Sequence, residues 1–249
     1  MEGVRAWTFL AGLAVALIAL PGPPAAAEAP SVDVFLCVDE GGPEIGIAAC
    51  TRVIEIWGAD NARIAWAFYH RANGFTAAGD YARAVADYDR AIGLKPDYML
   101  AYADRGLAWF GRGEYARAIE DYSRALRLAP SYATAYEDRC YSLAILGQTT
   151  RALADCDRAL ALSPHDPIFL DSRGYVYLRR GSPERAIRDY DAALRLAPEF
   201  DTALFGRALA YAARGDRRKA ARDLARARKI NPDIDRQMAK LHLRAPAGL

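Results

Sequence analysis

The stretch "YADRGLAWFGRGEYARAIEDYSRALRLAP" (102–130) decides the fold of this chain. Apolar residues recur in it at the spacing of one helix face, and Gly113 divides it into two such segments. Glycine accepts the left-handed conformation at which many helices end. Pro130 closes the stretch, because proline cannot continue a helix. The stretch therefore predicts a hairpin of two helices.

The same hairpin recurs along the chain with a period of 34 residues. Prolines stand at Pro96, Pro130, Pro164, Pro198 and Pro232, and glycines at Gly79, Gly113, Gly147, Gly181 and Gly215. Two series of alanines keep the same period, namely Ala84, Ala118, Ala152, Ala186 and Ala220, and Ala91, Ala125, Ala159, Ala193 and Ala227. The small alanines allow the helices to approach closely. One hairpin cannot bury its own apolar face, so the units must stack on one another.

This pattern resembles the tetratricopeptide repeat family, and the quoted stretch has nearly every signature position of its motif. The resemblance covers five units and implies an all-α fold, a right-handed superhelical solenoid of stacked helix-turn-helix repeats. The expected repeats are 65–98, 99–132, 133–166, 167–200 and 201–232. Residues 28–64 are expected to form an N-terminal cap with a degenerate half-repeat at 46–60. Residues 233–249 are expected to form a capping helix over 232–246 and a tail, with Asp233 as N-cap and Ile234, Met238 and Leu241 closing the last repeat.

The N-terminus predicts export. Arg5 precedes the apolar run "AWTFLAGLAVALIAL" (6–20), and Ala25-Ala26-Ala27 offers a cleavage site of small residues before Glu28. The run is shorter than the roughly 20 residues that span a bilayer as a helix. We therefore expect residues 1–27 to be a signal peptide and the protein to be periplasmic or secreted. Membrane contact is expected only if the segment stays uncleaved. Repeats rich in "RG" and "DY" with paired cysteines resemble exported bacterial members of the family.

Four cysteines allow two disulfides but do not require them. In the repeat fold that the resemblance implies, Cys140 and Cys156 face each other across one hairpin, and an oxidising compartment favours a bond between them. The same reasoning pairs Cys37 with Cys50 in the cap. The alternative is that all four are small buried hydrophobic residues. A zinc site is not expected, because His70, His165 and His242 do not cluster with the cysteines.

Two charged positions recur in all five units. They are Arg71, Arg105, Arg139, Arg173 and Arg207 in the first helix, and Asp87, Asp121, Asp155, Asp189 and Asp223 in the second. Such a ladder could line a binding surface, but a binding surface would vary between repeats. We therefore favour pairing of arginine with aspartate within or between repeats.

The resemblance also implies a concave groove lined by the first helix of each repeat. The residues carried over to it are Tyr69, His70, Asn73, Asp104, Leu107, Phe110, Glu137, Asp138, Tyr141, Asp171, Ser172, Tyr175 and Arg179. One subgroup of the family grips a C-terminal carboxylate with basic and amide side chains at these places, whereas here acidic residues occupy them. The expected partner is therefore a peptide or helix with basic and apolar residues, in contact with Phe110, Tyr141 and Tyr175 as aromatic anchors.

The sequence favours a non-catalytic scaffold. The formal net charge is only +2, which gives no reason to expect nucleic acid as a partner. No nucleophile elbow, phosphate loop or metal-ligand spacing is present, so neither cofactor nor metal is expected. The alternative is a redox-linked or hydrolytic accessory enzyme of the cell envelope, with Cys140 and Cys156 or the acidic cluster as reactive groups.

Overall fold

The computed structural model describes residues 31–38, 42–59, 61–241 and 243–247. The expected signal peptide and the expected mature start near Glu28 lie outside these residues. Within them, no helix combines the length and the apolar character that crossing a bilayer requires.

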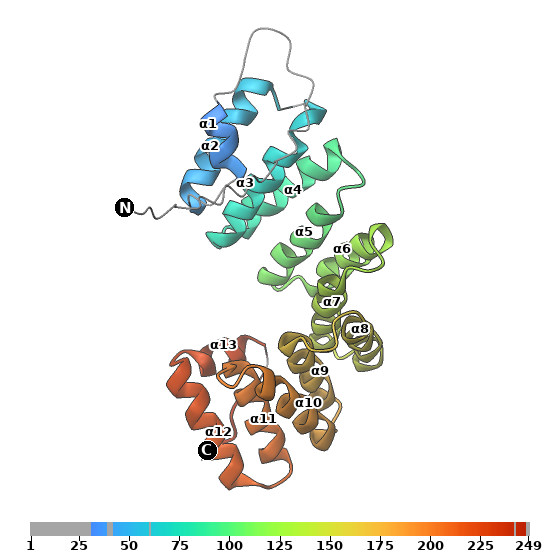
Figure 1. Cartoon of the computed structure of the whole chain (residues 1–249), viewed down its shortest axis with the longest axis vertical. Coiled ribbons are helices and arrows are strands. Elements are labelled where there is room, and N and C mark those ends of the chain that lie inside the picture. The colour runs from blue at the N-terminus through green and yellow to red at the C-terminus, as the bar shows by residue number, and fades with distance from the viewer. Residues whose placement is uncertain (1–30, 39–41, 60, 242, 248–249) are drawn as a thin grey trace, which may run out of the picture.

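The described chain is helical throughout its length, in pairs of antiparallel helices that follow one another along a curved path (Figure 1). The helices are α1 (Ser31–Val38), α2 (Pro43–Trp57), a 3-10 turn η1 (Ala62–Ile64), α3 (Ala65–Ala77), α4 (Tyr81–Leu94), α5 (Met99–Gly111), α6 (Tyr115–Leu128), α7 (Ala133–Ile145), α8 (Thr149–Leu162), α9 (Pro167–Arg179), α10 (Pro183–Leu196), α11 (Asp201–Ala213), α12 (Arg217–Ile230) and α13 (Ile234–Lys240). The all-α repeat solenoid predicted from the 34-residue period is thus confirmed.

The recurring residues do what the period predicts. The glycine between the helices of each pair from α3 to α12 has a φ of 71–84°, a conformation that other residues rarely adopt. The five prolines follow the ends of α4, α6, α8, α10 and α12. All ten alanines of the two series are fully buried where the helices meet.

The arginine and aspartate ladder holds the stack together. In the first four repeats each arginine donates two hydrogen bonds of 2.6–2.9 Å to the carboxylate 16 residues later, and Arg207 donates through Nε to Asp223 at 2.6 Å. The remaining Nη1 group donates to the unit before. Its acceptors are, in order, Thr51, Asp89, Ser123, Asp157 and Asp191. Each arginine therefore links its own second helix to the preceding one, which confirms the structural interpretation of the ladder.

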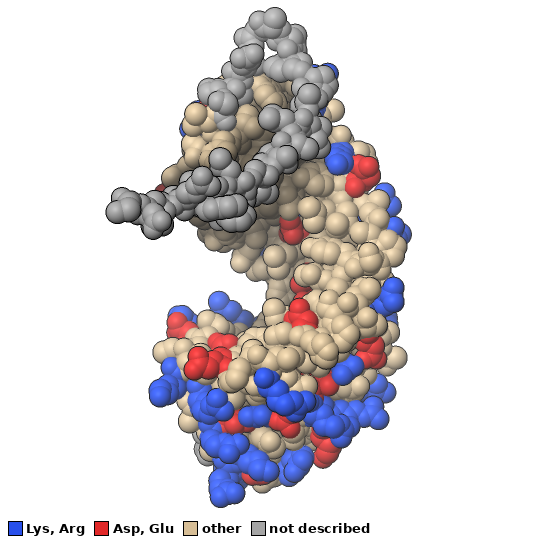
Figure 2. All heavy atoms as spheres, in the orientation of Figure 1, with Lys and Arg blue, Asp and Glu red and all other residues tan. Residues whose placement is uncertain are grey.

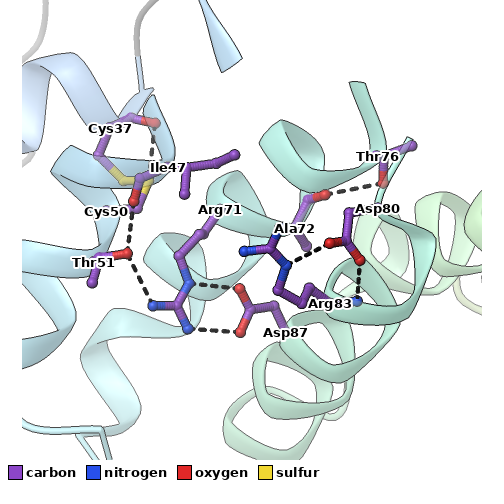
Figure 3. Close-up of polar contacts among 10 residues, drawn as sticks. All are labelled: Cys37, Ile47, Cys50, Thr51, Arg71, Ala72, Thr76, Asp80, Arg83 and Asp87. Atoms are coloured by element: carbon purple, nitrogen blue, oxygen red, sulfur yellow. Dashed lines mark hydrogen bonds and ion pairs between the residues drawn. A yellow bond between two sulfur atoms is a disulfide. The ribbon is translucent and has the colours of Figure 1, made fainter. Parts of the chain in front are cut away.

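The N-terminal cap joins the same ladder. Arg71 reaches back to the Thr51 hydroxyl at 3.2 Å, and that hydroxyl donates to the Ile47 carbonyl oxygen at 2.7 Å (Figure 3). The partner of Arg71 lies 20 residues back rather than 16, because the link from the cap to the first repeat is about one helical turn longer. Thus α2 takes the place of a second helix, although it begins at Pro43 rather than at the expected residue 46.

The structure places both cysteine pairs at bonding distance. The Cys37 and Cys50 sulfurs lie 2.08 Å apart and join α1 to α2 (Figure 3). The Cys140 and Cys156 sulfurs lie 2.00 Å apart and join α7 to α8. Both expected pairings are therefore present in this structure.

The C-terminal prediction was partly wrong. Ile234 and Met238 are buried against the last repeat, as expected, but α13 ends at Lys240 instead of continuing to residue 246. Asp233 stands before the helix without capping it through its side chain. Its carboxylate instead pairs with Arg236 at 3.0 Å.

The concave surface as candidate functional site

The candidate site lies on the hollow side of the curved molecule, which Figure 2 shows between the N-terminal and C-terminal lobes. The predicted groove residues all belong to the first helices α3, α5, α7 and α9. Acidic atoms appear along this hollow, whereas Lys and Arg gather mainly over the C-terminal lobe in the face shown (Figure 2).

Aromatic side chains form a row across three repeats. The Phe110 and Tyr141 rings lie 5.9 Å apart between centroids, and the Tyr141 and Tyr175 rings lie 4.8 Å apart. Tyr115 extends the row beyond Phe110 at 5.2 Å. Offset and tilted contacts of this kind stabilise neighbouring rings, so the row is rigid.

Tyr69 and His70 lie in a separate cluster at the N-terminal end. Their rings are 5.1 Å apart, Tyr98 lies 4.9 Å from Tyr69, and Trp66 lies 6.2 Å from His70. Burial lowers the pKa of His70 and therefore favours its neutral form. The structure thus divides the predicted groove residues into two aromatic groups rather than one.

Hydrogen bonds between repeats engage most of the groove carboxylates. Tyr69 donates to Asp104 at 2.7 Å, Thr202 donates to Asp171 at 3.1 Å, and Ser172 donates to Glu137. The Asp138 carboxylate differs from these three. Among the described residues it accepts no hydrogen bond and forms no ion pair.

The carboxylates of Glu137, Asp138 and Asp171 on the concave surface all have raised pKa values. Burial raises the pKa of Glu137 to about 7, against the lowering effect of the Ser172 hydrogen bond. Burial raises the pKa of Asp171 to about 7, with Glu137 adding to the increase. Burial and the charges of Glu137 and Asp104 raise the pKa of Asp138 well above its ordinary value. A cation beside these carboxylates would stabilise their charged forms, because it would replace the interactions with water that burial removes.

Not all predicted groove residues are available to a partner. Glu137 is 9% exposed, Ser172 3% and Tyr175 2%. The expectation that Tyr175 offers its ring as a surface anchor is therefore wrong for the chain as it is folded here. Leu107 is 45% exposed, and Arg179 is also exposed. Asn73 accepts a hydrogen bond of 2.6 Å from the Tyr88 hydroxyl, which engages it in the hairpin.

Sequence reasoning missed two contributors to this surface. Thr202 is the partner of Asp171, and its repeat position holds Leu100, Thr134 and Ile168 elsewhere, so no periodic signal marks it. The second is the chain after α13. Tyr175 donates to the Leu241 carbonyl oxygen at 3.4 Å, a contact between residues 66 positions apart. No local sequence pattern announces a contact of that range.

The cysteines named for the alternative enzyme do not present a reactive thiol. Cys140 and Cys156 are bonded to each other and fully buried, so neither presents a thiolate to solvent. In the part of the chain that the structure describes, no three His, Cys, Asp or Glu side chains are grouped so that they could hold a metal ion.

Comparison with known proteins agrees with the repeat architecture. Two family models, each described as tetratricopeptide repeat, match residues 73–139 and 172–233. No curated protein matches the chain by sequence.

Several solved structures share the fold. YrrB, described as a TPR protein with an unusual peptide-binding site, aligns with a TM-score of 0.57 at 25% identity over 79% of this chain and 100% of that one. A tetratricopeptide repeat protein from Parabacteroides merdae aligns with a TM-score of 0.63 at 19% identity, over 80% of this chain and 77% of that one. MamA from Desulfovibrio magneticus aligns with a TM-score of 0.60 at 18% identity, over 72% of this chain and 99% of that one. The last two show the fold alone.

The period, the left-handed glycines, the buried alanines and the two family matches agree with one another. This chain belongs to the tetratricopeptide repeat family.

Proposed function

We propose that this protein is a non-catalytic adaptor that binds a segment of a partner protein in its concave surface, outside the cytoplasm. Repeats of this family and the peptide-binding neighbour YrrB support protein–protein interaction as the general function. The partner segment has basic and apolar residues.

The observation that supports this partner chemistry most strongly is the Asp138 carboxylate. Burial and two neighbouring acids raise its pKa, and no described side chain compensates its charge. A lysine or arginine of a partner would supply both a countercharge and hydrogen bonds. Tyr141, from the same helix, and the exposed Leu107 would pack against apolar residues of the same segment.

The disulfide pairs support a location outside the cytoplasm, because such bonds persist in oxidising compartments. N-terminal sequencing of the protein from its native cells tests this part. We expect a mature chain that begins near Glu28. A chain that retains residues 1–27 would contradict cleavage.

Binding to an immobilised library of 12-residue peptides of varied charge and hydropathy tests the groove. We expect retention of peptides that combine lysine or arginine with large apolar residues. Asp138→Asn removes the charge with little change of shape and should weaken binding of these peptides about tenfold, the loss of one charge-assisted contact. Glu120→Gln is the matched control, because Glu120 is exposed on the second helix α6.

Two outcomes would overturn the proposal. One is a preference for acidic peptides. The other is equal binding by the Asp138→Asn and Glu120→Gln variants, which would place the binding site elsewhere on the solenoid. The enzyme alternative gains no support from the buried, bonded cysteines.

A further inference from the structure

The chain that follows α13 packs against the concave surface. We call Leu241 together with residues 243–247 the C-terminal tail. Leu243 is only 7% exposed, and its N–H donates to the Met238 carbonyl oxygen at 3.0 Å. Leu241 and Ala245 pack against the buried cluster of the C-terminal lobe, which includes Tyr175.

The repeat supplies an internal control for what the tail covers. Leu107, Tyr141 and Tyr175 occupy the same position in three successive repeats. Leu107 is 45% exposed, Tyr141 is partly exposed and Tyr175 is 2% exposed. The repeat geometry by itself leaves this position accessible. The tail contributes to this burial, since the Tyr175 hydroxyl donates to the Leu241 carbonyl oxygen at 3.4 Å. Tyr141 and Arg179 also contribute, because they lie against the same ring.

The tail also has the chemistry proposed for the partner. Residues 240–246 read "KLHLRAP", in which Lys240 and Arg244 alternate with Leu241 and Leu243. The segment 243–246 has no regular secondary structure, and it follows Leu241, whose carbonyl oxygen contacts Tyr175 at the end of the aromatic row. Pro246 is compatible with such a backbone and disfavours helix.

We propose that the C-terminal tail is a tethered placeholder for the partner. The partner segment is an irregular or extended peptide with alternating basic and large aliphatic residues, and it displaces the tail. One of its aliphatic side chains then takes the place of Leu243 in the buried cluster that also contains Tyr175. This inference rests on the proposed function, which it makes specific for one part of the concave surface.

A tethered placeholder lowers the affinity that is measured for a partner. If about a tenth of the molecules have the tail released, the apparent dissociation constant is about tenfold higher than the intrinsic one. Removing the tail from the surface should therefore strengthen binding by about this factor without adding a contact.

The direct test uses a fluorescent peptide with the sequence of residues 239–247, "AKLHLRAPA", and the full chain. Leu243→Asp should release the tail, because a carboxylate cannot be buried in the apolar cluster that holds Leu243 without a partner. We expect this variant to bind the peptide about ten times more tightly than the native chain. Ala247→Asp is the matched control, since it adds the same charge at an exposed tail position and should bind as the native chain does. Equal binding by all three chains would overturn the placeholder.

A second measurement uses the native chain and does not depend on the folding of a variant. The Leu243 N–H is held by its hydrogen bond to Met238 in the turn that follows α13, so its hydrogen exchange reports the opening of this turn that displacement of the tail requires. Adding a basic, apolar peptide retained in the library screen should accelerate this exchange. Binding of that peptide without faster exchange at Leu243 would overturn the placeholder and leave the adaptor function intact. Absence of any peptide binding, with the Leu243→Asp chain folded, would overturn both.

Discussion

A single arginine per repeat does more than its pairing pattern predicts. Arg139 donates two hydrogen bonds to Asp155 and one to the Ser123 hydroxyl of the preceding repeat at 2.9 Å. The sequence predicts the first contact, because arginine and aspartate recur together in all five units. It does not predict the second, since the acceptor is Thr51, Asp89, Ser123, Asp157 or Asp191, depending on the repeat. A contact that accepts several residue types leaves no periodic signature.

Replacing Arg139 tests the ladder. Arg139→Ala leaves the buried Asp155 carboxylate without its countercharge, and we expect the free energy of unfolding to fall by about 3 kcal/mol. Urea titration measures this change. Arg127→Ala, at an exposed position of α6, is the control and should cost less than about 0.5 kcal/mol. Similar losses for both variants would show that the ladder does not stabilise the stack.

The raised pKa values on the concave surface predict a dependence of stability on pH. Glu137 and Asp171 have ordinary values of 4.5 and 3.8, and burial raises the pKa of each to about 7. The folded state therefore binds more protons than the unfolded state between about pH 4 and pH 7, and stability from these groups falls as pH rises through that window.

We expect the melting temperature of the native chain to fall more between pH 5 and pH 8 than that of a Glu137→Gln/Asp171→Asn variant. The lowered pKa of His70 acts in the opposite direction, because the neutral form is favoured in the fold, and it acts equally in both chains. Thermal unfolding of both at matched ionic strength gives the comparison. Parallel pH profiles would contradict the assignment of these two carboxylates.

At the scale of the helical hairpin, one unit uses a different solution to the same packing problem. In the second repeat Gly106 faces Tyr122, and a Cβ on that glycine would lie 2.7 Å from the ring. The fourth repeat pairs Gly174 with Tyr190 in the same way, at 2.9 Å. The third repeat has Cys140 and Cys156 at these two places, joined as a disulfide. The same space between the helices is filled either by a tyrosine ring that faces a glycine or by two cysteines joined as a disulfide.

Replacing the disulfide of the third repeat by a glycine–tyrosine pair tests whether the two arrangements are equivalent. Replacing both cysteines by alanine should cost about 3 kcal/mol, the stabilisation that a loop of this length gives when closed. Cys140→Gly/Cys156→Tyr should recover about 2 kcal/mol of that loss, because the buried ring fills the space that the sulfurs leave. This glycine–tyrosine variant should also unfold at the same urea concentration with and without a reductant, because it has no disulfide between α7 and α8. Cys37 and Cys50 are replaced by alanine in all of these chains, so that no second disulfide responds to the reductant. A glycine–tyrosine variant no more stable than the double alanine variant would contradict the equivalence.

At the scale of the whole molecule, the buried apolar residues form two clusters instead of one. One runs from Cys37 to Ala108 and the other from Ile119 to Leu243. Between them lie buried residues of α6 that belong to neither cluster, among them Ala118, Tyr122 and Ala125. In a repeat protein, stability is a sum of the units and their contacts with neighbours, so two clusters along the array can unfold separately.

We therefore expect unfolding in two steps. Native-state hydrogen exchange at increasing urea should show one free energy for the amides of α2–α5 and another for those of α7–α12. A destabilising change in α8, such as loss of its disulfide, should lower only the second. A single free energy shared by all buried amides would show instead that the solenoid unfolds as one unit.

How much of this molecule the sequence predicts depends on whether a feature repeats. The hairpins, their glycine ends, the arginine pairs and the Cys140–Cys156 pair follow from residues compared across five units, and all are present. The ends of the array and the surface chemistry have no second copy for comparison. Three features therefore could not be predicted, because each depends on a contact made once. They are the length of α13, the absence of a side-chain cap at Asp233 and the burial of Tyr175.

The links between successive second helices fix more than stability. Each arginine is held by the aspartate of its own repeat and donates one further hydrogen bond to the preceding unit, so the step from one unit to the next has little freedom to change. Equivalent positions on the inner side, such as those of Leu107 and Tyr141, are consequently spaced at an interval that the protein sets and a ligand must match. A concave surface with this fixed spacing selects ligands by the distance between their apolar side chains. We expect two peptides of identical composition to be distinguished by the number of residues between their apolar side chains.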